Sequence, residues 1–157
     1  HVPASEPIAD VSRCAVLKVE LLGDVLNGMV FNGQQLIVHV EALIPAAFWR
    51  HGVDLGLLLS RNDGLKCAAL TTRHLPATSV WIPLGADVYR ARCIIADLPL
   101  LAGRYDFSVG LLESGSPLVL AQVHRAAVFE VRSSGWDVAL MRIEHSWSTQ
   151  DDNDSAT

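Results

Sequence analysis

The chain has 157 residues, of which half are hydrophobic and 18% are charged, and its formal net charge is −5. This length fits a single domain with its own core, and the composition is far from that of a disordered chain. The 12 basic residues are outnumbered by 17 acidic ones, which argues against nucleic acid as a partner because phosphate contacts need clustered lysine and arginine.

The two ends differ from the middle of the chain. Residues 1–12 carry two prolines and little periodic pattern, which predicts a linker, and the polar residues 148–157 predict a disordered tail. The folded domain is therefore expected at residues 13–147. The first residue is not Met, so we expect a piece of a longer protein. Three cysteines stand in apolar runs and are expected as buried free thiols, which favours a reducing compartment.

Alternation of apolar and polar residues dominates the middle of the chain. In residues 35–41, for example, Leu36, Val38 and Val40 alternate with polar residues, as is typical of a half-buried strand. Asn-Gly and other glycine-containing turn signals separate such runs. They predict eight strands, near 13–22, 34–42, 53–60, 65–71, 88–96, 104–113, 124–132 and 137–146. Residues 45–49 could form a helical turn at most. The expected fold is all-β, with two packed antiparallel sheets.

A search for catalytic motifs finds none. The chain has no P-loop, no Gly-x-Gly-x-x-Gly and no Gly-x-Ser-x-Gly sequence, and no cysteine pair has zinc-ligand spacing. A Ser–His–Asp set could still assemble in three dimensions, because such triads are defined by geometry. We therefore expect a non-enzymatic domain without cofactor or metal, and keep a small hydrolase as the alternative without motif support.

Small and acidic residues occupy the outward positions of three predicted strands. If these strands are neighbours in one sheet, they form a shallow face lined with hydrogen-bonding groups. Glycine in a strand often marks the close approach of a ligand, and a carboxylate accepts hydrogen bonds from vicinal hydroxyls. The alternative is an ordinary solvent-exposed face. The residues are Asp54 and Gly56, then Asp106, Ser108 and Gly110, then His124 and Ala126.

Three further residues are candidates for the rim of this face. Trp81 is either a core plug at one end of the sandwich or an aromatic platform that stacks on a sugar. Arg73 and His74 follow the strand predicted at 65–71, where a solvated loop is the alternative. The candidate ligand-binding set is therefore Asp54, Asp106, Ser108, His124, Arg73, His74 and Trp81.

The order of several motifs carries a family resemblance. Residues 31–40 are similar to a Phe-x-x-Gly-x-x-Leu-x-Val pattern, and residues 55–64 to a strand that ends in Asp-Gly. Residues 98–109 match Leu-x-Leu-x-x-Gly-x-Tyr-x-x-x-Val, and residues 124–131 contain a Phe-x-Val strand. Together they resemble the C-terminal carbohydrate-binding domain of Wzt-type ABC-transporter ATPases, which export bacterial O-antigen polysaccharide. The resemblance covers residues 13–147.

The resemblance implies an immunoglobulin-like antiparallel sandwich of about eight strands. Such a domain would bind the exported polysaccharide at its chemically modified non-reducing end. An ATPase domain would precede it and connect it to the membrane subunit, at the cytoplasmic side of the bacterial inner membrane. The family also implies a homodimer that exchanges the last strand, here 137–147, with residues 133–135 as the hinge. The alternative from another class is a structural or dimerisation sandwich with no glycan affinity.

Overall fold

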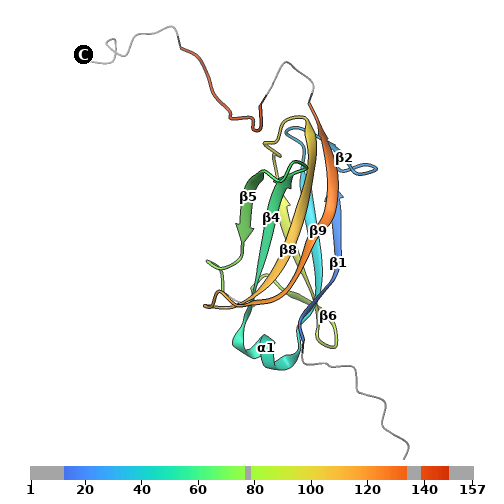
Figure 1. Ribbon diagram of the computed structural model, residues 1–157, viewed down its shortest axis with the longest axis vertical. Coiled ribbons are helices and arrows are strands. Elements are labelled where there is room, and N and C mark those ends of the chain that lie inside the picture. The colour runs from blue at the N-terminus through green and yellow to red at the C-terminus, as the bar shows by residue number, and fades with distance from the viewer. Residues whose placement is uncertain (1–12, 77–78, 134–138, 149–157) are drawn as a thin grey trace, which may run out of the picture.

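Two β-sheets packed face to face make up the fold in the computed structural model, which describes residues 13–76, 79–133 and 139–148 (Figure 1). The first sheet has the strand order β1-β3-β7-β6, and the second has the order β2-β9-β8-β4-β5. All strand pairs are antiparallel except β2 with β9. The predicted all-β sandwich is therefore confirmed. The strands are β1 (Ala15–Gly23), β2 (Met29–Phe31), β3 (Leu36–Leu43), β4 (Val53–Arg61), β5 (Lys66–Thr71), β6 (Ile82–Gly85), β7 (Val88–Ile95), β8 (Gly103–Glu113) and β9 (Val119–Arg132).

Seven of the eight predicted strands are present, and β9 begins five residues earlier than expected. The helical turn is present as the six-residue α1 (Ala46–His51). The short strands β2 and β6 were not predicted. The strand expected at 137–146 begins outside the described residues, and residues 139–146 form no strand. They make one isolated bridge, between Leu100 and Met141.

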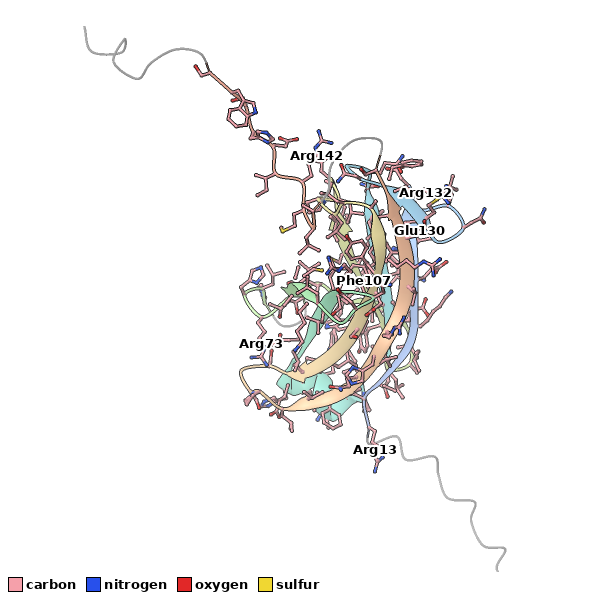
Figure 2. All side chains as sticks on the ribbon, turned by 45° about the horizontal axis from the view of Figure 1, so that its top comes forward. Arg13, Arg73, Phe107, Glu130, Arg132 and Arg142 are labelled. Carbon is pink, nitrogen blue, oxygen red and sulfur yellow. The ribbon has the colours of Figure 1, made fainter. Side chains whose placement is uncertain are left out.

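The core lies between the sheets and is built from alternate positions of β3, β4 and β8. In β8, Tyr105, Phe107, Val109 and Leu111 are all buried. The ring of Phe129 in β9 stacks on Phe107 and Tyr105, with centroid distances of 5.5 and 5.8 Å. Figure 2 shows Phe107 inside the sandwich. This alternation directs the intervening residues of β4 and β8 to the outer face of the second sheet.

Tyr105 provides a test of this packing. Its hydroxyl donates a hydrogen bond to the Leu101 carbonyl oxygen at 2.8 Å, inside the protein. Tyr105→Phe leaves that carbonyl without its partner, so we expect the free energy of unfolding to fall by about 1–2 kcal/mol. Urea denaturation measures this loss. A variant as stable as the wild type would show that the hydrogen bond contributes nothing net.

The three cysteines are free thiols, as predicted. Only Cys14 is fully buried, and burial raises the pKa of its thiol to about 11. Cys67 and Cys93 are half-buried, so the prediction of full burial is wrong for these two. In the part of the chain that the structure describes, no helix is long and apolar enough to cross a membrane.

Candidate functional site

The three strands that carry the predicted small-residue face are neighbours, in the order β9-β8-β4. Gly56 of β4 stands opposite Gly110 of β8, and Leu58 stands opposite Ser108. Their chain neighbours Leu57 and Val109 are buried in the core. The small residues therefore lie together on the outer face of the second sheet.

A groove of about 390 Å³ runs across this outer face, and we call it the outer groove. Its size falls within the range of roughly 300–1,000 Å³ that is usual for small-molecule sites. Gly56 and Gly110 lie between β5 and β9, where Thr71 stands opposite Gly56 and Gln122 stands opposite Gly110. Apolar side chains from four strands lie around this row. Polar side chains complete the lining. The apolar residues include Leu58, Ala69, Leu112 and Val119, and the polar ones are Thr71, Arg73, Ser108, Gln122 and His124.

Three of the seven predicted binding residues line the outer groove: Arg73, Ser108 and His124. The two predicted carboxylates do not, because Asp54 and Asp106 are only 3% and 5% exposed. Each instead lies beneath an arginine. The expectation that these carboxylates form an open, hydrogen-bonding floor is therefore wrong for the geometry observed, and their contact with a ligand stays a prediction.

Asp54 lies beneath Arg73, which lines the outer groove. Its carboxylate accepts a hydrogen bond from Ser114 Oγ at 3.0 Å and lies 4.0 Å from Arg73 Nε. The same arginine donates through Nη2 to the carbonyl oxygen of Ser116, in the turn between β8 and β9. Arg73 thus joins the loop after β5 to that turn (Figure 2). This link connects two segments beside the groove.

Asp106 has a similar arrangement, near a bulge in β9. Arg125 has a positive φ of 50°, its Nε lies 3.6 Å from the Asp106 carboxylate, and its backbone N–H donates to Ser108 Oγ at 3.1 Å. The register between β8 and β9 shifts at this point, as is usual for a β-bulge, which re-aims nearby side chains. Ser108 therefore holds the bulge as well as lining the groove.

Gln122 is a groove residue that sequence reasoning missed. Its side-chain Nε2 lies 2.6 Å from His124 Nε2, so the two form a polar pair on the β9 wall. The predicted strand began only at residue 124. If the predicted strand had begun earlier than residue 124, the alternation of its side chains would have placed Gln122 on the same face as His124.

Trp81 and His74 are not part of the outer groove. Trp81 is 5% exposed and belongs to the core, where its indole Nε1 donates to the Val53 carbonyl oxygen at 3.0 Å. This is the core-plug alternative, because a sugar platform needs an exposed ring face. His74 lines a second groove of about 260 Å³. Its lining residues come from β4, from the end of β5, from β7 and from the loop that precedes β6. The structure thus separates these two from the other candidates.

Within the described residues, no group of three or more histidine, cysteine, aspartate or glutamate side chains is placed to hold a metal ion. The chemistry that the outer groove offers is instead apolar contact together with hydrogen bonding from Thr71, Ser108, Gln122 and His124. The guanidinium of Arg73 adds a positive charge at one end.

Comparison with solved structures shows a close match of fold. The C-terminal domain of Wzt superposes with a TM-score of 0.69 at 15% identity, over 87% of this chain and 84% of that one. A β-glucuronidase from Bifidobacterium dentium matches with a TM-score of only 0.44 at 13% identity, over 76% of this chain and 18% of that one. No protein-family model matches the chain, and no curated protein matches it by sequence. The resemblance predicted from the motifs is thus confirmed at the level of the fold.

Proposed function

We propose that this chain is a non-catalytic carbohydrate-binding module and that the outer groove is its glycan site. The observation that carries the proposal is the groove itself, with a glycine floor, apolar walls and polar side chains around them. A sugar ring presents both C–H faces and hydroxyls, so it complements such a mixture. The groove is built on the strands of a sheet, which keeps its geometry fixed before the ligand arrives.

The ligand that we propose is an exported bacterial O-antigen polysaccharide, bound at its modified non-reducing end. Support comes from the motif order and from the shared fold with the Wzt C-terminal domain. In this proposal an ATPase domain precedes the chain, and the module works in the cytoplasm, at the inner face of the bacterial inner membrane. There it selects the polysaccharide for the membrane subunit of the transporter.

Gln122→Ala and His124→Ala test the proposal. Each removes one hydrogen-bonding group from the groove, so each is expected to weaken polysaccharide binding by about three- to tenfold. Isothermal titration calorimetry with the O-polysaccharide of the encoding bacterium, and with a panel of others, measures the affinity. His74→Ala is the matched control, because this histidine lies in the second groove. The proposal is wrong if no O-polysaccharide binds, or if only the His74 variant loses affinity.

We also propose a homodimer in which the C-terminal segment docks on a second copy. In the described residues, no strand pairs with Ala91–Ile95 of β7 on the side away from β3, because β6 reaches only to Arg90. The second groove opens beside this edge. Beyond Arg142, which still bonds to its own domain, the segment 143–148 extends away from the sandwich, with Ile143 and Trp147 exposed by 73% and 91% (Figure 1). An extended apolar segment and an unpaired edge are complementary.

A further inference from the structure

Gly56 and Gly110 are glycines that the fold does not require. Neither has a positive φ. A Cβ added at Gly110 would meet no atom within 4 Å, and one added at Gly56 would lie 3.5 Å from Leu112 Cδ1, an ordinary contact. Gly23 is different, since it has a φ of +88° and its added Cβ would lie 2.7 Å from the Gln35 carbonyl oxygen. Local backbone geometry and packing therefore explain Gly23 but neither groove glycine.

Two glycines side by side in the middle of a sheet lower its stability relative to alanine. Their shared effect here is to open the outer groove down to the backbone, because the strands stand directly opposite each other at Gly56 and Gly110. Any side chain at Gly110 would project into the space that a ligand occupies. The missing side chains thus define the depth of the groove.

The floor of the groove offers almost no free hydrogen-bonding group. Both β4 and β8 have a strand on each side, so their backbone amides are engaged in the sheet ladder. Among the described residues, the apolar walls are Leu58, Ala69, Leu112 and Val119, and no phenylalanine, tyrosine or tryptophan lines the groove. Thr71 stands opposite Gly56, but its Oγ1 already accepts a hydrogen bond from the Arg73 backbone N–H. Gln122 stands opposite Gly110, and its Nε2 lies 2.6 Å from His124 Nε2. A sugar hydroxyl that faces the glycine pair would lose water without gaining a partner from the backbone of the floor, which is unfavourable. A methyl group there would gain from the burial of its apolar surface.

We propose that the Gly56–Gly110 floor receives a methyl group of the bound glycan, for which a 6-deoxyhexose is the simplest source. The two glycines are then specificity-determining residues of the outer groove. The polar side chains Gln122 and His124 hydrogen-bond the remaining hydroxyls of the same sugar. This inference rests on the proposed glycan-binding function and narrows its ligand to methyl-bearing sugars.

Matched sugars that differ at one methyl group test the inference. Amide chemical-shift titrations would compare L-rhamnose with L-mannose, L-fucose with L-galactose, and 3-O-methyl-D-glucose with D-glucose. The first two pairs represent a deoxy methyl and the third an ether methyl. We expect the methyl-bearing member of at least one pair to bind about tenfold more tightly than its partner and to shift the amides of Gly56 and Gly110. Equal or tighter binding of the hydroxylated partners in every pair would overturn the inference.

Gly110→Ala provides the second arm of the test, with Gly85→Ala as its control. Gly85 lies in β6 of the other sheet, and its added Cβ also meets nothing within 4 Å. Both variants should keep or slightly raise the melting temperature, since alanine suits a strand better than glycine. Only Gly110→Ala should weaken binding of the O-polysaccharide and of the preferred sugar, by about tenfold.

The outcomes separate the inference from the function on which it rests. If the polysaccharide binds the wild type and Gly110→Ala equally well, the glycan-binding function stands and the glycine floor is wrong. If neither the polysaccharides nor any single sugar binds the wild type, the proposed function itself is wrong. Where single sugars bind too weakly to measure, the polysaccharide affinity of Gly110→Ala against that of Gly85→Ala decides.

Discussion

Trp81→Ala is expected to lower the free energy of unfolding by about 3–5 kcal/mol. The side chain is almost fully buried among the core residues of both sheets, and its indole nitrogen satisfies the Val53 carbonyl at the start of β4. Removing it leaves a cavity and an unpaired carbonyl oxygen. Urea denaturation followed by far-UV circular dichroism measures the change, since the tryptophan fluorescence signal is itself altered by the substitution.

Trp81→Phe separates the core role from the sugar-platform alternative. Phenylalanine keeps most of the ring volume and loses the hydrogen bond, so the expected loss of stability is smaller, although the unpaired Val53 carbonyl still costs about 1–3 kcal/mol. The folded variant should bind polysaccharide as the wild type does, because Trp81 does not line the outer groove. A Trp81→Ala protein with wild-type stability and lost glycan affinity would contradict this assignment.

The sequence predicts best those strands whose alternation is set by the core. In β8 the buried series Tyr105, Phe107, Val109 and Leu111 is fully visible in the sequence. The strands β2 and β6 have only three and four residues, too few for a periodic pattern. They pair because distant segments bring them to a sheet edge, as when β2 lies parallel to β9. That information is not local to either segment.

The same distinction explains which parts of the candidate site could be predicted. The glycines and Ser108 were found because their positions follow from the strand period alone. The burial of Asp54 and Asp106 depends instead on residues far along the chain, namely Ser114 and the two arginines that cover the carboxylates. The bulge at Arg125 likewise changes the direction of the β9 side chains. Neither feature leaves a signal in the local sequence pattern.

The covered carboxylates still bear on binding, through the walls of the outer groove. Arg73 holds the loop after β5 against the turn between β8 and β9, and Arg125 lies over Asp106 beside the β9 bulge. Both arginines are partly exposed, so the ion pairs themselves add little to stability. We expect the Arg73 link to reduce the ordering of these two loops that a ligand would otherwise have to impose, and such ordering opposes affinity.

If the proposed dimer forms, removal of the C-terminal segment is expected to convert it into a folded monomer. A chain ending at Ser134 lacks Leu140 and Arg142, whose backbone groups bond to Leu101 and Pro99, and lacks the exposed Trp147. Leu140 is only partly buried where it packs against the core, so the core should remain intact. Sedimentation equilibrium of the two chains measures the difference. A truncated chain that stays a folded dimer would show that this segment does not hold the copies together.

Trp147→Ala tests the same contact with a single substitution. Burying a tryptophan side chain removes about 150–250 Å² from water, which favours association by about 4–6 kcal/mol before the entropy lost on binding. Even if half of this is realised, the dimer dissociation constant should rise by about 30-fold or more. Leu26→Ala is the control, because Leu26 is also exposed but lies in the turn before β2. A wild-type chain that is monomeric at every concentration would refute the dimer, while leaving the outer groove free to bind its glycan as a monomer.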